Sequence, residues 1–441
     1  MKIYNNKNVS EYDLIVLGGG ASGLFLGASL NLNGKALNGK SGLIIEASDT
    51  LGKKILASGG GRCNFTHAGS IKDFIHCYHS LSSKAGSFVR SPLYKFNNLK
   101  TRDFFESIGL SSYSQDDDRV FPSSNKSITV RNALVKKCEL NSWTFSLNTR
   151  IVKIENNNNC WLLKSDDGDY FIAKKLVIST GSPAWKYDDC SNQIFNDLKN
   201  LGVKIVNPLP ALTPITIKNF NMKSLSGISF ENASLSLVNS DTKKCIYKNS
   251  GDILITETGF SGPLALNSSW FINKLKSECF LQKEGKDFEL IIELKDDNFL
   301  HEFDFHGVNL SLSNAIKNYS SLPERYIRFL SGDSSDQKAS SVPLKKINAI
   351  INNMYKLSYP SSLINNSSFE NAMSSLGGVS LDEINNKTFQ CKSLKGLYVI
   401  GEALDISGDS GGYNLQFMWS SAMSASLCLA RDFARTPIHD L

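Results

Sequence analysis

The sequence predicts an α/β fold, with parallel-sheet character at both ends of the chain and a separate antiparallel β region between them. Three observations predict it. An apolar strand leads into a glycine-rich turn and a helix over residues 14–30. Buried-strand character returns at residues 175–181 and again at 396–402. Between about 195 and 370 the chain instead shows short strands, a pattern typical of antiparallel sheets.

The first element is the strand, turn and helix of residues 14–30. Residues 14–17 form a short apolar strand that leads into Gly18-x-Gly20-x-x-Gly23, and the residues that follow have helical spacing. Gly18 permits the turn, Gly20 lets a pyrophosphate approach the backbone, and Gly23 lets helix and strand pack closely. The pyrophosphate then lies on the helix N-terminus, so the sequence predicts a Rossmann-type dinucleotide site.

The next strand indicates which nucleotide this turn accepts. Residues 41–46 form a buried-strand run that ends in Glu46, 23 residues after Gly23, and the usual spacing is about 20. A carboxylate there pairs with ribose hydroxyls and repels a 2′-phosphate, so we expect an FAD-like or NAD-like nucleotide rather than an NADP-like one. The alternative is a glycine-rich turn in an ordinary βαβ unit, with an exposed Glu at the strand end.

Composition and charge limit the class of protein. The 441 residues suffice for two or three domains, and 41% apolar with 20% charged residues is typical of a soluble globular protein. Nine cysteines lie singly, with no CxxC pair, which favours reduced thiols in a cytosolic protein. Residues 1–13 are polar, and the glycines of the apolar stretch 14–30 argue against a membrane span, so we expect a cytoplasmic location without a signal peptide or membrane partner. The net charge of +6 permits an acidic partner such as RNA without arguing for one.

A second glycine-rich segment follows Glu46. Gly59-Gly60-Gly61 precede Arg62, Cys63 and Asn64 without apolar periodicity, so we expect a loop with accessible backbone amides against which a flat polar ligand lies. The alternative is a flexible surface loop. Residues 71–137 are expected to be mostly helical, and residues 143–173 to alternate as a β-meander before a strand over 175–178 ends on Thr180-Gly181.

The rest of the chain falls into an insert and a return to the sheet. Short strands are expected at 213–217, 233–238, 252–257 and 288–295 without intervening helices, which suggests a barrel or sandwich, and helices at 313–330 and 344–355. A strand beginning at 396 ends on Gly401-Glu402, and a long helix is expected over 415–435. Its Gly412-Tyr413-Asn414 start leaves free amides and a partial positive charge.

These segments resemble the flavoprotein family variously called BaiN-type, YhiN-type or aminoacetone-oxidase-like, whose members bind FAD and belong to the glutathione-reductase structural group. The matching segments are residues 18–23, 52–64, 259–263, 376–379 and 396–419. The resemblance implies a discontinuous FAD-binding domain over 1–195 and 370–441, an inserted antiparallel, β-barrel-like domain over 196–310 and a small helical subdomain over 311–369.

The resemblance also implies the cofactor site. The ADP half of FAD takes the glycine-rich turn and Glu46, and the ring side takes the second glycine-rich segment and the turns before the C-terminal helix. The expected FAD-binding residues are Gly18, Gly20, Ala21, Ser22, Gly23, Glu46, Lys54, Ser58, Gly60, Gly61, Arg62, Cys63, Asn64, Thr180, Gly181, Gly401, Glu402, Gly412, Tyr413, Asn414 and Leu415. Arg62, Asn64 and Asn414 are the candidate catalytic residues, because positive charge and helix-terminal amides near the ring stabilise reduced flavin. For Arg62 the alternative is a surface or ion-pair residue.

Two segments depart from the family pattern. Ser182-Pro183-Ala184-Trp185 follows Thr180-Gly181 where the family has a second Gly and a Gly-rich turn, and Glu257 stands where the family has His. Both are expected to border the substrate side, so the resemblance says less about the identity of the substrate than about the cofactor. No second nucleotide fingerprint follows a strand, so NADH or NADPH is expected to bind transiently. No metal is expected, because His76-Cys77-Tyr78-His79 lacks further ligands at known spacings.

Three functions remain open at this point. The first is an FAD-dependent oxidoreductase that takes hydride from NAD(P)H and reduces a C=C bond; family members are associated with such reduction of uridine in ribosomal RNA to dihydrouridine and of steroid-like enones. The second, also attributed to the family, is an oxidase of a small amine such as aminoacetone, with O₂ as acceptor. The third is an RNA- or protein-binding module in which FAD is structural. The expected partner is accordingly a small-molecule or RNA substrate, with ribosomal RNA foremost.

Overall fold

The computed structural model describes residues 9–34, 37, 39–157, 160–185, 190–282, 287–295 and 308–435. The chain forms two compact units. The first consists of Met1–Leu209 with Met373–Leu441, and the second of Pro210–Ala372. Within the described ranges, no helix combines the length and the apolar character that crossing a membrane requires.

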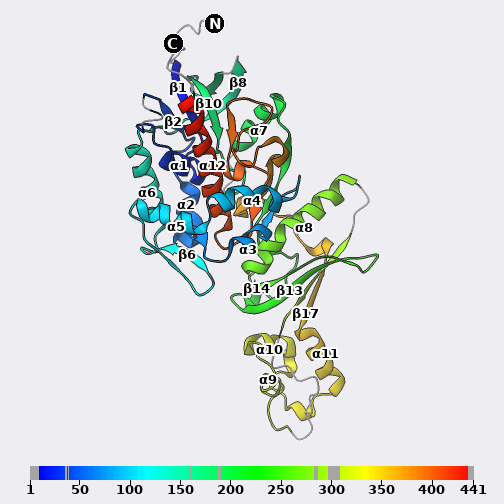
Figure 1. The fold of residues 1–441 in the computed structure, drawn as a ribbon. Coiled ribbons are helices and arrows are strands. Elements are labelled where there is room, and N and C mark those ends of the chain that lie inside the picture. The colour runs from blue at the N-terminus through cyan, green and yellow to red at the C-terminus, as the bar shows by residue number, and fades with distance from the viewer. Residues whose placement is uncertain are drawn as a thin grey trace. The chain divides into compact units, whose positions relative to one another are not determined.

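A mainly parallel sheet forms the centre of the first unit (Figure 1). Its parallel strands lie in the order β7 (Thr144–Ser146), β2 (Gly42–Ile45), β1 (Val9–Leu17), β10 (Tyr170–Ile178) and β19 (Leu397–Val399). Two further strands, β9 (Cys160–Ser165) and β8 (Ile151–Asn157), extend it antiparallel from the first half of β10. Leu14, Ile15 and Val16 are fully buried, as expected for a strand covered on both faces.

Helices from the two ends of the chain pack side by side on this sheet. They are α1 (Ala21–Ser29) and α12 (Tyr413–Arg435), which Figure 1 shows in blue and red. The rings of Phe25 and Trp419, one from each helix, lie 5.1 Å apart. The other helices of this unit are α2 (Lys53–Ala57), α3 (Ile71–His76), α4 (Ala85–Lys95), α5 (Asn98–Ser107), α6 (Ser127–Leu140) and α7 (Cys190–Asn200).

Three small sheets complete the first unit and shape its loops. The first joins β3 (Thr66–His67), β6 (Arg119–Pro122) and β5 (Ser112–Ser114), the second β4 (Tyr78–His79) and β20 (Ser407–Gly408), and the third β11 (Ile205–Ala211) and β18 (Ser374–Val379). The second of them connects the segment after α3 to the turn that precedes α12.

The predicted α/β class and Rossmann-type sheet are confirmed, but the predicted meander over residues 143–173 is partly wrong. β7 joins the parallel part of the sheet beside β2. The two strands predicted at 170–173 and 175–178 form the single strand β10, which pairs with β9 at its start and with β19 at its end. Alternation of apolar and polar residues indicates a strand with one buried face, but it does not indicate whether the neighbouring strand is parallel or antiparallel.

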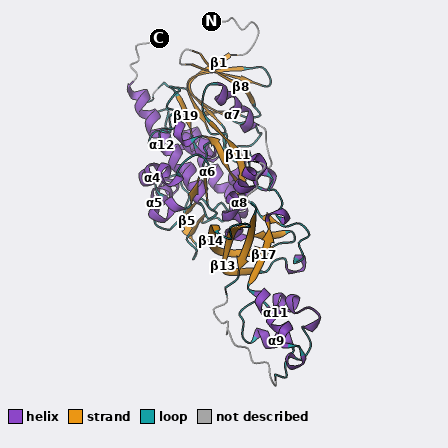
Figure 2. Ribbon diagram, turned by 90° about the vertical axis from the view of Figure 1, so that its right-hand side faces the viewer, coloured by secondary structure: helices purple, strands orange, loops and turns teal. Residues whose placement is uncertain are grey.

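The second unit contains a six-stranded antiparallel sheet (Figure 2). Its order is β12 (Ile215–Thr216), β15 (Gly259–Ser261), β14 (Cys245–Ile255), β13 (Ser229–Asn239), β16 (Phe288–Glu293) and β17 (Lys356–Pro360). The segment after β17 returns to the opposite edge strand: Lys218 N donates to Leu363 O at 2.7 Å, and Asn365 N donates to Thr216 O at 2.9 Å. These bonds give the sheet a barrel-like closure.

The helices of the second unit correct two predictions. No helix was expected among the strands, yet α8 (Gly262–Gln282) packs on β13 and β14. Pro263 near its start and the buried Leu264, Ile272 and Leu275 are the helical signals in this stretch. The helix expected over 313–330 is interrupted over residues 318–323, and Pro323, which cannot donate a helical hydrogen bond, stands directly before the second part. The result is α9 (Leu312–Lys317) and α10 (Glu324–Ser331), followed by α11 (Leu344–Met354).

Candidate functional site

The glycine-rich turn after β1 is built so that only one of its glycines faces open space. Gly18 has a φ of +106°, and a Cβ there would lie 2.5 Å from Ser179 O. A Cβ at Gly23 would lie 2.0 Å from Gly18 O, so α1 packs on the strand end at a distance that excludes a side chain. At Gly20, the N-cap of α1, a Cβ would meet nothing within 4 Å. An anionic group therefore has room to approach the first amides of the helix at Gly20.

Glu46, directly after β2, holds this turn in place. Its Oε2 accepts a hydrogen bond from Gly19 N at 2.9 Å, while Oε1 accepts from Ser48 N at 3.0 Å and from Ser48 Oγ at 2.8 Å. An ionised carboxylate offers about four acceptor positions. Oε2 therefore keeps one acceptor position for a ligand hydroxyl beside the glycine-rich turn.

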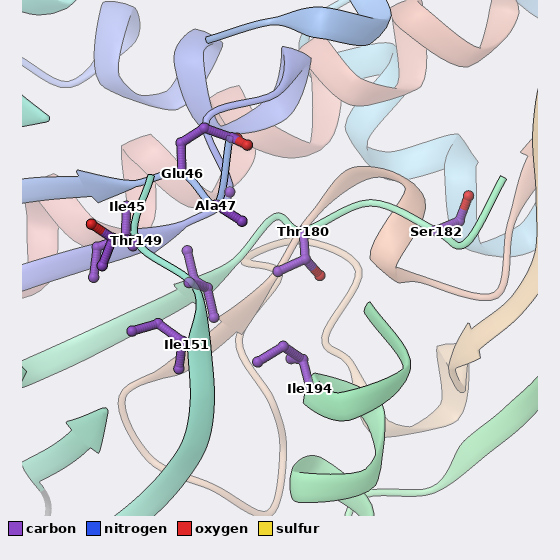
Figure 3. A pocket seen from close by; sticks show the side chains of 10 residues that line it. Ile45, Glu46, Ala47, Thr149, Ile151, Thr180, Ser182 and Ile194 are labelled. Carbon is purple, nitrogen blue, oxygen red and sulfur yellow. The ribbon is translucent and has the colours of Figure 1, made fainter. Parts of the chain in front are cut away.

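A cavity opens at the carboxyl ends of β1 and β2, where parallel α/β sheets bind their ligands (Figure 3). Its lining is Leu17, Gly18, Ile45, Glu46, Ala47, Thr149, Ile151, Thr180, Ser182 and Ile194. Thr180 Oγ1 and Ser182 Oγ are buried and make no hydrogen bond within the described part of the chain. Ser182, which was expected on the substrate side, thus shares one cavity with Glu46.

The second glycine-rich segment forms a tight left-handed turn. Its three glycines, residues 59–61, have φ values of +56°, +65° and +84°, a region that favours glycine. A Cβ added at Gly60 or Gly61 would meet nothing within 4 Å, so a flat ligand has access to this backbone. The Arg62 guanidinium carbon lies 4.4 Å from the centre of the Phe121 ring, a cation–π contact that holds the charge beside the loop.

Cys63 and Asn64 lie buried below this turn. Burial raises the pKa of the Cys63 thiol to about 12, so the thiol stays neutral and is no nucleophile at pH 7. The side-chain oxygen of Asn64 accepts a hydrogen bond from Val120 N at 3.2 Å. The polar group of Asn64 is therefore used to join the loop to β6.

Lys54 and Glu402 form an ion pair between α2 and the turn after β19. Lys54 Nζ lies 2.6 Å from Glu402 Oε2, and Glu402 is only 6% exposed. The residue before it, Gly401, has a φ of +64°, and a Cβ there would lie 2.0 Å from Ser22 Oγ. This turn is consequently held against the start of α1 on one side and against α2 on the other.

The start of α12 is the third glycine-rich turn of the site. Gly411 and Gly412 precede Tyr413 with φ values of +122° and +99°. The Asn414 side chain bonds twice to Gly408: Oδ1 accepts from Gly408 N, and Nδ2 donates to Gly408 O, both at 2.8 Å. Asn414 therefore fixes the loop before the helix, and the helix's first backbone amides are the groups left to face a ligand.

His67, which is not among the residues predicted from the sequence, lies against Tyr413. The two rings stack with centres 4.9 Å apart, and His67 Nδ1 accepts a hydrogen bond from Gly69 N at 3.0 Å. The neutral imidazole therefore carries its proton on Nε2. Burial lowers the pKa of His67, against the opposing effect of the Asp118 and Asp117 carboxylates. The signal in the sequence was its place three residues after Asn64, next to the glycine-rich segment.

The parallel sheet, the open glycine-rich turn and the carboxylate after β2 define a Rossmann-type dinucleotide-binding protein. The family described as HI0933-like protein Rossmann domain matches residues 12–428. The chain belongs to this family, the FAD-binding oxidoreductases of BaiN/YhiN type. The resemblance inferred from the sequence is confirmed, and the class of enzyme is that of the FAD-dependent oxidoreductases.

Individual proteins similar to this chain align over nearly its whole length. It is 26% identical over 423 residues to the ribosomal RNA dihydrouridine synthase of Escherichia coli (strain K12), covering 95% of this chain and 98% of that protein. It is 25% identical over 424 residues to the 3-dehydro-bile acid delta(4,6)-reductase of Clostridium scindens, covering 94% and 98%. A solved structure, 3-ketosteroid delta1-dehydrogenase from Sterolibacterium denitrificans, aligns with a TM-score of 0.48 and 12% identity over 96% of this chain and 100% of that one.

The residues of the cavity fit the adenosine half of FAD. Glu46 Oε2 offers an acceptor for a ribose hydroxyl, and the buried hydroxyls of Thr180 and Ser182 have no partner in the described structure. Ile45, Ile151 and Ile194 supply apolar walls for a flat base. A few polar groups in a mainly apolar lining are typical of cofactor sites.

Glu46→Ala is expected to weaken FAD binding by about 1–3 kcal/mol, because a charge-assisted hydrogen bond to the ribose is lost. It also removes the acceptor of Gly19 N, so the flavin-free variant should unfold at a lower temperature than the wild type. Titration of the flavin-free protein with FAD measures the first effect. Ser48→Ala, which removes one hydroxyl donor to the same carboxylate, is the matched control and should bind FAD nearly normally. If Glu46→Ala binds FAD as tightly as the wild type, the carboxylate only stabilises the turn and does not bind the cofactor.

Proposed function

We propose that this protein is a reductase that takes hydride from NADH or NADPH through FAD and delivers it to an electron-poor C=C bond. Uridine in ribosomal RNA, with dihydrouridine as the product, is the leading candidate substrate. The observation that carries the proposal is the full-length similarity to a ribosomal RNA dihydrouridine synthase. The similarity to a 3-dehydro-bile acid reductase supports the same reaction type.

The residues of the first unit divide between the two halves of the cofactor in this proposal. The turn of residues 18–23, Glu46 and Thr180-Gly181 bind the ADP half. Residues 58–64, 401–402 and 412–415, with Lys54, bind the ribityl chain and the ring. FAD, once bound, supplies the hydride-transfer chemistry, and the chain supplies its placement and electrostatics.

Positive groups on the segments proposed for the ring favour its reduced, anionic form. The first amides of α12 carry the partial positive charge of a helix N-terminus. Arg62 adds a full charge, held on the Phe121 ring. Groups of this kind act strongly because they are fixed in place before the charge on the ring develops.

Reduction of a C=C bond adds a hydride to one carbon and a proton to the other, so the site needs a group that is protonated at neutral pH. Burial raises the pKa of Tyr413, so its phenol stays protonated beside the start of α12. His67 stays neutral, because burial lowers its pKa and Gly69 N–H occupies Nδ1. We assign proton delivery to Tyr413, whose proton water then restores, and positioning of the Tyr413 ring to His67, which stacks on it.

Charge is unevenly distributed between the two units, and this bears on an RNA substrate. Residues 210–372 carry 17 Lys and Arg against 17 Asp and Glu, so the whole net charge of +6 belongs to the rest of the chain. Lys and Arg bind nucleic acid mainly through its phosphates. We therefore assign phosphate contacts to the FAD-binding unit, which carries the excess, and substrate selectivity to the inserted unit. An enzyme of ribosomal RNA works in the cytoplasm, where we place this protein.

The experiment that tests this function is anaerobic reduction of the FAD-loaded protein followed by reoxidation. NADH or NADPH should bleach the flavin absorbance within the time of a turnover, and unmodified ribosomal RNA should restore it with formation of dihydrouridine. Restoration by a steroid-like enone and not by RNA would keep the reductase and reject the RNA substrate. Bleaching by aminoacetone and not by NAD(P)H would replace the reductase with an amine oxidase.

Arg62→Ala is expected to lower the flavin reduction potential and slow reduction by NADH while FAD content stays normal, because one fixed positive charge is lost. Such an interaction is worth on the order of 1–3 kcal/mol. Arg119→Ala is the matched control, since Arg119 lies 6.0 Å from the same Phe121 ring and is paired with Asp117 at 2.6 Å. Spectroelectrochemistry of both variants decides the matter: equal potentials would remove Arg62 from the mechanism.

A further inference from the structure

We propose that Ser182 is an FAD-binding residue, and that with Thr180 it forms a hydroxyl pair that recognises the adenosine half of the cofactor. The proposal concerns cofactor recognition only, so it holds whichever substrate the enzyme reduces.

The hydroxyls of Thr180 and Ser182 are not satisfied by the described part of the chain. Ser182 Oγ and Thr180 Oγ1 are buried, yet the described residues offer neither of them a hydrogen-bond partner. A buried hydroxyl left without a partner is costly, which is why such groups are rare in folded proteins. Because these two hydroxyls also line a cavity, we infer that a ligand completes their hydrogen bonding.

The position of the two hydroxyl residues also favours a ligand. Both residues line the cavity that is also lined by Glu46 and by Gly18, the first residue of the glycine-rich turn (Figure 3). The third hydroxyl in the lining, Thr149 Oγ1, is already bonded to Ser146 Oγ at 2.7 Å and to Leu147 O at 3.0 Å. Thr180 and Ser182 are therefore the hydroxyls of this lining that remain to bond a ligand.

The chemistry of these groups indicates the class of ligand. Hydroxyls both donate and accept hydrogen bonds, so they match the ring nitrogens, the amine and the ribose hydroxyls of adenosine. Glu46 beside them accepts only, and it repels a phosphate on the ribose. Gly181, between the two hydroxyl residues, has a φ of +75°, the left-handed conformation that glycine adopts without strain. The ligand class is therefore an adenosine diphosphate moiety without a 2′-phosphate.

The test compares Ser182→Ala and Thr180→Val with Ser424→Ala in flavin-free protein titrated with ADP and with FAD. Ser424, on α12, is the matched control because its hydroxyl is also buried and unpaired among the described residues but lies outside this cavity lining. Each cavity variant should weaken the binding of both ligands about 5- to 10-fold, the effect of one lost hydrogen bond, and Ser424→Ala should bind both like the wild type.

Thermal unfolding distinguishes a loss of FAD binding from a general destabilisation of the fold. A hydroxyl without a partner stabilises nothing in the flavin-free protein, so flavin-free Ser182→Ala should unfold at the wild-type temperature or above it. Its FAD-loaded form should unfold below the FAD-loaded wild type. Should the flavin be inseparable from the folded chain, faster FAD release from Ser182→Ala holoenzyme on dilution replaces the titration. Wild-type ADP affinity in Ser182→Ala, or equal weakening in Ser424→Ala, would overturn the proposal.

Discussion

Gly23→Ala is expected to give a protein that is strongly destabilised and does not retain FAD. The new Cβ would lie 2.0 Å from Gly18 O, a backbone atom that cannot rotate away, so α1 must separate from the end of β1. Overpacking of this kind costs about 3 kcal/mol. The same shift moves the first amides of the helix, to which we assign the pyrophosphate. Urea unfolding and the flavin content of the purified protein measure the two effects.

Gly20→Ala separates the two effects and is the matched control. A Cβ at Gly20 would meet nothing within 4 Å, and the φ of −80° is one that alanine adopts freely. The flavin-free variant should therefore lose less than about 1 kcal/mol, the cost of alanine in place of glycine at an N-cap. Its FAD affinity should fall about tenfold or more, since a methyl group occupies the place proposed for the pyrophosphate, where the backbone must be approached closely. Wild-type affinity in this variant would show that the pyrophosphate lies elsewhere.

Lys54→Met is expected to have the second-largest effect, because it leaves the carboxylate of Glu402 buried without its cation. Breaking a buried pair from one side costs about 3–5 kcal/mol. Lys54 is 35% exposed, and water screens the pair, so we expect about 2 kcal/mol in urea unfolding. FAD content should fall as well, since the pair holds the turn that packs on Ser22 at the start of α1.

The neighbouring residue supplies the control for this prediction. Lys53 pairs with Asp49 at 3.1 Å, but these side chains are 49% and 71% exposed. Lys53→Met should therefore change the free energy of unfolding by less than about 0.5 kcal/mol. Adding Glu402→Gln to Lys54→Met should recover part of the lost stability, because the unpaired charge is then gone. Equal losses of unfolding free energy in Lys53→Met and Lys54→Met would show that the Lys54–Glu402 pair stabilises the fold no more than an exposed ion pair does.

The sequence predicts well what is encoded in contiguous residues. The strand, turn and helix of residues 14–30 depend on local spacing, and so does the position of Glu46 at the end of the next strand. The helix α8 was missed although its apolar spacing is local, because the short strands on either side suggested an uninterrupted β region. The break between α9 and α10 was missed because the apolar pattern continues through Pro323, a residue that the interior of a helix cannot accommodate.

Contacts between distant segments were beyond the reach of the sequence. Lys54 and Glu402 are 348 positions apart, and their pairing depends on how α2 and the turn after β19 meet in the fold. His67 and Tyr413 stack for a similar reason. Asn64 and Asn414 are expected near the flavin from motif position, and the structure adds that the side-chain oxygen of Asn64 bonds to Val120 N and that both amide atoms of Asn414 bond to Gly408. Side-chain type gives no indication of such partners.

We propose that the glycine-rich turn and Glu46 recognise an ADP moiety, which FAD has and FMN lacks. The most direct measurement is a parallel titration of the flavin-free protein with FAD and with FMN, followed by flavin fluorescence. We predict that FAD binds at least about 100-fold more tightly than FMN, since FMN forgoes the hydrogen bonds of the turn, of Glu46 and of Ser182. Equal affinities for the two flavins would contradict the claim.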